Sequence, residues 1–181
     1  MPLTLRLLAL RGAALLAIIP GMAQAATPVC LTRTEATGLV AYSLPQVIRG
    51  SGKRCQTTLP AGSFLPANAR SMAQRYETQK AGYWPQAKQA FLKVGTARDP
   101  GMAQVFRQMP DDSLQKLLDV AVEGIIVQAI PLTSCGTIDT AASLLAPLPP
   151  ENLAGVIALA MEVGKKAEPA KGAAGITICK D

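Results

Sequence analysis

Apolar residues recur every three or four positions over most of the chain that follows residue 30, which is the spacing of one face of an α-helix. The pattern is strongest in residues 114–130, where apolar side chains cover most of the helix circumference. A helix that is apolar nearly all round is normally surrounded by other helices. We therefore predict that this segment, which lies between Pro110 and Pro131, is the central helix of the fold.

Shorter helices with the same spacing are expected to pack around it. Thr32 and Glu35 fit a capping box at the start of the first of these helices. Pro45 is expected to end or kink that helix, and Gly50 to stop it. Pro85 suits the first position of another helix. The further helices are predicted over residues 67–80, 85–94, 102–109, 137–146 and 151–163.

The first 25 residues have the features of a secretory signal peptide. Arg6 and Arg11 make the early segment positive, residues 13–19 are apolar, and small residues end the segment at Ala25. The alternative is an uncleaved membrane anchor, which Arg11 disfavours because a spanning helix needs about 20 apolar residues. Cleavage after Ala25 leaves residues 26–181, which we predict to be a single all-helical domain with a mobile segment at 167–175.

Four cysteines remain after this cleavage, and an even number in an exported chain predicts two disulfides. They are Cys30, Cys55, Cys135 and Cys179. We favour the pairs Cys30–Cys55 and Cys135–Cys179, because each then closes one contiguous segment. A zinc site would need all four thiols reduced, since the chain has no histidine, and we therefore predict no metal.

The composition also narrows the possible chemistry. The absence of histidine excludes a Ser-His-Asp or Cys-His site, and no motif indicates a cofactor. Removing the two signal-peptide arginines lowers the net charge from +6 to +4, which is only mildly basic. No basic block interleaved with aromatic residues indicates nucleic-acid binding. No transmembrane segment is predicted after signal cleavage, since Asp119 and Glu123 interrupt the most apolar stretch.

Two groups of residues are candidates for a functional site. The first is a surface for a ligand or partner, because aromatic rings beside cations stack on sugars and bind anions. Its members are Tyr76, Tyr83 and Trp84 with Arg75, Lys80 and Lys88. The alternative is that Trp84 fills a corner of the core. The second group is Asp119 and Glu123, which are either an acid–base pair or, as we favour, the solvated edge of their helix beside Lys116.

The sequence thus predicts an all-α fold, a compact bundle of about six unequal helices tied by two disulfides. Residues 176–178 are expected to form a short extended C-terminal anchor. The function we expect is that of a periplasmic or secreted, non-catalytic protein that binds an unknown protein or envelope component, or helps to maintain the envelope. The alternatives are a carrier of a small apolar ligand and a carboxylate-dependent hydrolase acting on envelope glycan.

Overall fold

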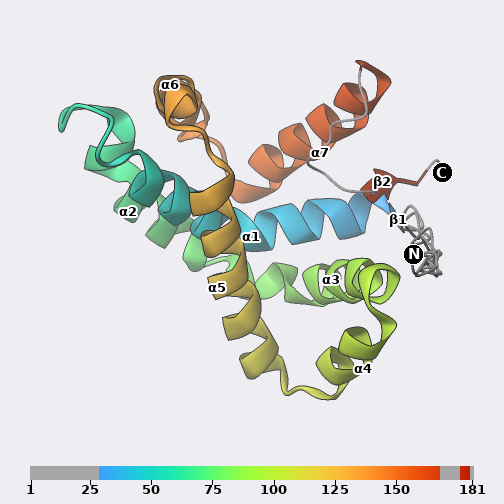
Figure 1. Ribbon diagram of the computed structural model, residues 1–181. Helices are drawn as coiled ribbons and strands as arrows, with labels where there is room; N and C mark the ends of the chain where they lie inside the picture. The colour runs from blue at the N-terminus through green and yellow to red at the C-terminus, as the bar shows by residue number, and fades with distance from the viewer. Residues whose placement is uncertain (1–28, 168–175, 180–181) are drawn as a thin grey trace, which may run out of the picture.

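The computed structural model describes residues 29–167 and 176–179. The predicted signal peptide, and the part of the predicted mobile segment beyond residue 167, lie outside this range. The described residues form an all-α fold with two short strands, as the sequence predicts (Figure 1). The elements are β1 (Val29–Leu31), α1 (Arg33–Cys55), α2 (Phe64–Glu77), α3 (Trp84–Arg98), α4 (Pro100–Gln108), α5 (Asp111–Ala129), α6 (Cys135–Leu145), α7 (Pro150–Ala167) and β2 (Ile176–Ile178), with short 3-10 turns at η1 (Lys80–Tyr83) and η2 (Leu132–Ser134).

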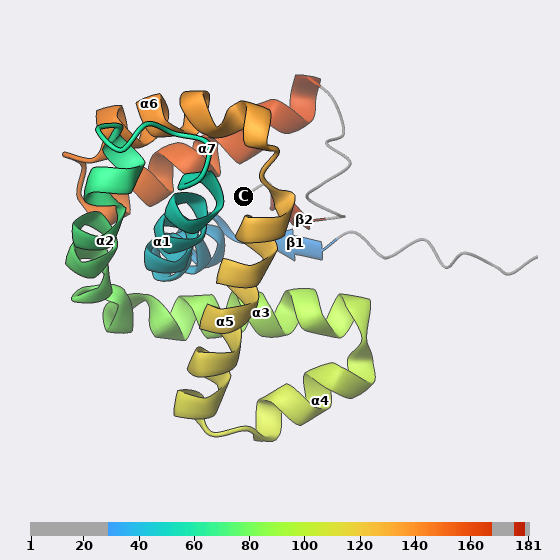
Figure 2. The same cartoon turned by 60° about the vertical axis from the view of Figure 1, so that its left-hand side comes forward.

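The central helix is α1, and the prediction that residues 114–130 hold this position is wrong. Figure 2 looks almost along α1 and shows other helices on its different sides. The helices with extensive contacts to α1 are α2, α3, α5 and α7, whereas α5 packs extensively on α1 alone. Side chains on several sides of α1 are buried, among them Tyr42, Leu44 and Ile48. The core therefore lies around α1, with α2 and α6 on one side and α3 and α5 on another.

The helix α1 starts as predicted but ends later. Thr32 accepts a hydrogen bond from the Glu35 backbone, and the Glu35 carboxylate accepts one from the Thr32 backbone, which confirms the capping box. The helix then continues through Pro45 and Gly50 to Cys55, so the expected break is wrong. Both residues are buried, and neighbouring helices hold this segment in place. Tertiary packing here overrides the local preference of the chain.

Glycines in α1 lie where other helices approach most closely. A Cβ atom at Gly50 would lie 2.9 Å from Ile126 of α5, and one at Gly52 would lie 2.8 Å from Ala69 of α2. A Cβ atom at Gly38 would overlap the Cβ atom of Gln86 in α3. Gly50, which we expected to stop the helix, and the other two glycines therefore let the backbones of α2, α3 and α5 approach α1 closely.

Replacing Gly38 by alanine should therefore destabilise the protein. Overpacking against Gln86 costs about 1–3 kcal/mol, which outweighs a gain of roughly 1 kcal/mol from the higher helix propensity of alanine. Gly124 is the matched control, because among the described residues no atom of another element lies within 4 Å of a Cβ atom built there. Urea denaturation should show Gly38→Ala lowering and Gly124→Ala raising the free energy of unfolding. A stabilising Gly38→Ala substitution would contradict the close packing of α3 on α1.

Polar side chains from other elements bind the ends of the outer helices and hold them in place. Asp139 of α6 accepts hydrogen bonds from the backbone nitrogens of Phe64 and Leu65, at 3.2 and 2.6 Å, and so caps α2 from another element. Arg54 donates from Nε to the carbonyl oxygen of Ile130, at 2.9 Å, just beyond the end of α5. These contacts satisfy backbone groups that a helix leaves unpaired at its ends.

The two disulfides join other pairs than those we favoured. Cys30 is bonded to Cys179, and Cys55 is bonded to Cys135. The physical reason is the length of α1, which separates Cys30 from Cys55 by 23 helical residues, or about 35 Å. A disulfide needs Cα atoms within roughly 7 Å. The bridge from Cys55 instead joins the end of α1 to the start of α6.

The extended C-terminal anchor is confirmed. The strand β2 pairs in parallel with β1, with Cys30 opposite Thr177. The pair lies beside the N-terminal end of α1 (Figure 1). Thr177 Oγ1 donates to the carbonyl oxygen of Val29 at 3.2 Å, and the Cys179 amide donates to that of Leu31 at 2.8 Å. The Cys30–Cys179 bridge then closes this pair covalently.

Candidate functional site

The predicted aromatic and basic surface is divided between the interior and the outside. Tyr76, Trp84 and Lys80 are buried, whereas Arg75 is exposed, and Tyr83 and Lys88 are half-buried. Each of the six makes a hydrogen bond to another part of the chain. Their contacts hold helices together, and whether the outer members also bind a ligand stays a prediction.

Arg75 and Tyr76 fasten the connection between α6 and α7. Tyr76 donates from its hydroxyl to the carbonyl oxygen of Leu148, and Arg75 donates to that of Ala146, at 2.8 and 2.6 Å. Burial raises the pKa of Tyr76, and the nearby Arg75 only partly offsets this. Tyr83 donates to Glu151 at the start of α7, at 3.2 Å.

Trp84 and Lys88 hold the start of α5. Trp84 Nε1 donates to one carboxylate oxygen of Asp111 at 2.8 Å, and Lys88 pairs with the other. These two hydrogen bonds, with that of Lys88 the larger influence, keep the pKa of Asp111 below its ordinary value. The Trp84 ring packs on Tyr42 with centroids 5.1 Å apart. Trp84 therefore fills a corner of the core, and its partner is a carboxylate.

Lys80 is the centre of a charge network that joins α1, α2 and α5. Its ammonium group bonds Asp119 at 2.5 Å and Glu77 at 3.3 Å, and it lies 4.5 Å above the Tyr42 ring. Arg49 extends the network from Glu77 to Glu123. Asp119 and Glu123 therefore face other elements, and our expectation that they form a solvated edge with Lys116 is wrong.

This network leaves a small polar pocket of about 280 Å³ beside Tyr42. The Tyr42 hydroxyl and the second oxygen of Asp119 line it, and both are buried without a partner in hydrogen-bonding geometry. Burial, followed by the charge of Asp119, raises the pKa of Tyr42, so its hydroxyl stays protonated.

The charge network makes stability depend on acid pH. Burial acts to raise the pKa of Glu77, but Arg49 and Lys80 lower it more strongly, so it lies below the ordinary value of 4.5. The ionised carboxylate therefore stabilises the folded state at pH values above 4.5, and this contribution is lost as the pH falls below it. Because Glu77 is partly exposed, we expect a contribution of about 0.5 kcal/mol. In urea denaturation, Glu77→Gln should reduce the acid-induced loss of stability, and an unchanged pH profile would contradict this.

A second feature is a strip of uncharged residues along the side of α5 that faces away from α1. We call it the α5 outer face, and it comprises Leu117, Val120, Ala121, Gly124 and Ile125. The exposed fractions of Leu117, Val120 and Ile125 are 40%, 75% and 62%. Leu114 and Leu118, nearer the start of the same helix, are instead buried in a cluster with Tyr42 and Trp84. Among the described residues, α5 therefore leaves large apolar side chains exposed.

Sequence reasoning missed this face because it equated apolarity with burial. The available signal was the absence of charge from positions 117, 120, 121, 124 and 125, which share one side of the helix. Large apolar side chains are also exposed on other helices, namely Leu144 of α6 and Val156 and Leu159 of α7. Exposed apolar residues that share one helix face, as on α5, are typical of interaction surfaces.

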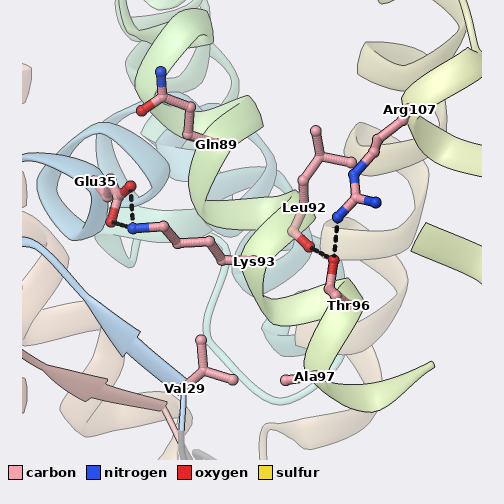
Figure 3. Close-up of a pocket in the computed structure, with 8 residues that line it drawn as sticks. All are labelled: Val29, Glu35, Gln89, Leu92, Lys93, Thr96, Ala97 and Arg107. Carbon is pink, nitrogen blue, oxygen red and sulfur yellow. Dashed lines mark hydrogen bonds and ion pairs between the residues drawn. The ribbon is translucent and has the colours of Figure 1, made fainter. Parts of the chain in front are cut away.

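A third feature is an open, mainly apolar groove of about 650 Å³, the α3–α4 groove (Figure 3). Most of its lining comes from α3, through Gln89, Leu92, Lys93, Thr96 and Ala97. Val29 of β1, Glu35 of α1 and Arg107 of α4 complete it. Figure 3 shows Lys93 directed toward Glu35 on one side, and Arg107 directed toward Thr96 on the other.

Comparisons with known protein families, with curated proteins and with solved structures found no match. Among the described residues, no single helix has the length and apolarity of a membrane span; α5 together with residues 132–145 has both, but the two parts meet at a bend of 91°. The two disulfides are typical of an oxidising compartment. The case for a function therefore rests on the geometry of these three features.

Proposed function

We propose that this is an exported, non-catalytic binding protein that packs the α5 outer face against an uncharged, apolar helix of a partner protein. The observation that carries the proposal is the exposure of Leu117, Val120 and Ile125 together on one helix, α5. Covering these side chains removes apolar surface from water, which favours association. A partner supplies the cover that the chain's own helices do not.

The shape of this face favours a helix as the occupant. Ala121 and Gly124 lie in the middle of the strip, with Leu117, Val120 and Ile125 around them. Small residues at the centre let two helix backbones approach closely, and larger residues at the sides then interlock. A glycine inside a helix otherwise costs about 1 kcal/mol relative to alanine, and among the described residues no other element approaches within 4 Å of a Cβ atom built at Gly124.

The charges of α5 favour a protein over a lipid surface. Helices that lie on membranes usually carry lysine or arginine beside their apolar face. Here α5 contains four carboxylates, at Asp111, Asp112, Asp119 and Glu123, and one cation, Lys116. Anionic lipid repels this helix. An uncharged helix of a partner protein matches the uncharged face and leaves these carboxylates with their present partners.

The arrangement of the acidic side chains supports a non-catalytic role. Asp119 is bonded to Lys80, and Glu123 lies between Arg49 and Lys53. A glycan hydrolase of the kind we considered uses one carboxylic acid that stays protonated and one free carboxylate. Two carboxylates that are each paired with cations are poorly suited to those roles.

Crosslinking in intact cells tests the proposed surface. A photoreactive phenylalanine derivative at position 120 or 125 should capture the same partner protein, and the captured peptide should belong to an uncharged apolar helix. The control position is 104, since Gln104 is exposed on α4. Capture of lipid alone, capture of a second copy of this chain, equal capture from position 104, or no adduct would overturn the proposal.

Export is the other part of the proposal, and the two disulfides support it. We propose that the mature protein begins at Ala26 and resides in the periplasm or outside the cell. The mass of the purified protein, together with its N-terminal sequence, measures this directly. A mature chain that retains residues 1–25 would contradict cleavage and favour the anchored alternative.

A further inference from the structure

We propose that the α3–α4 groove binds an amphipathic monoanion, with its apolar tail along the groove and its carboxylate on Arg107. This site is separate from the α5 outer face, so it goes beyond the proposed function. The groove has the volume of a small-molecule site, about 650 Å³, and its exposed lining is mainly apolar. Val29, Leu92 and Ala97 supply apolar contacts for a tail (Figure 3).

Arg107 supplies the binding group for the anion. Among the described residues its guanidinium has one partner, the Thr96 hydroxyl, which accepts a hydrogen bond from Nη2 at 2.9 Å. Thr96 in turn donates to the carbonyl oxygen of Leu92 at 2.7 Å, which fixes the orientation of its hydroxyl. Guanidinium has five N–H donors, so Arg107 retains enough of them to bind a carboxylate through two hydrogen bonds.

The position of Arg107 is fixed by packing. Phe106, the preceding residue of α4, packs on Phe91 of α3 with ring centroids 5.2 Å apart. Asp99 caps the start of α4 by accepting from the Met102 backbone at 3.0 Å. The ring contact holds α4 against α3, and the hydrogen bond to Thr96 places the guanidinium beside the groove before any ligand arrives. Such preorganisation lowers the entropic cost of binding.

The charge of the groove favours a ligand with a single negative charge. Lys93 is neutralised by Glu35, since its ammonium group lies 2.6 and 2.7 Å from the two carboxylate oxygens. Glu35 is buried and its pKa is lowered: burial opposes this, but Lys93 and Thr32 outweigh it, so the pair stays ionised at neutral pH. The net charge of the groove is therefore that of Arg107. A neutral ligand leaves this cation without a partner.

Titration of the mature protein, with both disulfides intact, by decanoate below its micellar concentration tests the proposal. Heteronuclear NMR should show one site, with shifts confined to residues of α3, α4, β1 and the start of α1. Decanol, which has the same tail without the charge, should bind at least about tenfold more weakly, as expected for the loss of a charge-assisted hydrogen-bonded pair.

Two substitutions separate the roles of charge and shape. Arg107→Gln should weaken decanoate binding at least about tenfold, whereas Arg98→Gln should leave it unchanged, because Arg98 carries the same charge on α3 outside the groove. Ala97→Phe should block the groove and abolish binding. The absence of decanoate binding, equal binding of decanol, equal weakening by Arg98→Gln, or full binding by a folded Ala97→Phe variant would overturn the proposal. Because Arg107 is exposed, the Arg107→Gln variant should fold, and it still tests the proposal if Ala97→Phe does not fold.

Discussion

Replacing Cys55 and Cys135 together by alanine should lower the free energy of unfolding by about 4 kcal/mol. A bridge that closes a segment of this length stabilises mainly by restricting the unfolded chain, by roughly 4–5 kcal/mol in the chain-entropy description. Both sulfur atoms also lie in the core, where Cys55 and Cys135 are fully buried among Leu44, Leu65 and Met72. Their loss removes packing as well as the covalent bond.

The matched variant is Cys30→Ala with Cys179→Ala, for which we expect a smaller loss of about 2 kcal/mol. The chain-entropy description alone predicts the opposite order, because this bridge spans 149 residues rather than 80. However, β2 pairs only with β1 and can detach without unfolding the helices, which limits the loss. Guanidinium denaturation without reductant measures both variants. An equal or larger loss for the Cys30–Cys179 pair would contradict this order.

Leu114→Ala should lower the free energy of unfolding by about 3 kcal/mol, whereas Val120→Ala should change it by less than about 0.5 kcal/mol. The two residues lie on the same helix, but Leu114 is fully buried and Val120 is three-quarters exposed. The first substitution leaves a cavity beside Tyr42 and Trp84, and the second leaves none. Chemical denaturation of the isolated protein measures both. A loss at Val120 equal to that at Leu114 would place the α5 outer face in the core.

Local signals in the sequence were sufficient for the ends of several elements. The capping box at Thr32 and Glu35 and the proline near the start of α3 both follow from short-range chemistry. Each depends on residues within one or two turns, where side-chain and backbone groups compete directly. These parts of the fold were predictable because no distant contact opposes them.

The position of α1 was not predictable in this way. A helix that others approach on several sides needs small residues at the contacts, and α1 has Gly38, Ala41, Ser43, Gly50 and Ser51 buried along it. Small residues do not raise the apolarity of a segment, so α1 looked less central than α5. The prediction of the disulfide pairs was wrong for a related reason. We expected the first helix to break at Pro45 and stop at Gly50, and a shorter helix would have allowed Cys30 to lie near Cys55.

The candidate sites were likewise predictable in part, by residue type, but their contacts with distant elements were not. The aromatic and basic residues 75, 76, 80, 83, 84 and 88 were found by type, but their partners come from elements 23–72 residues away and no local pattern indicates them. The α5 outer face was present in the sequence as a charge-free strip. Its exposure became visible only when α1, not α5, was found at the centre of the fold, with α5 packing extensively on α1 alone.

The most direct test of the account is the crosslink from position 125 in a Gly124→Leu background. Leucine makes the α5 outer face more apolar, and a Cβ atom at Gly124 faces open space among the described residues, so the fold should be retained. It also prevents close approach of a second helix backbone. We predict that the adduct with the partner protein is lost in Gly124→Leu and retained in Gly124→Ala. An undiminished adduct in Gly124→Leu would contradict helix packing on this face.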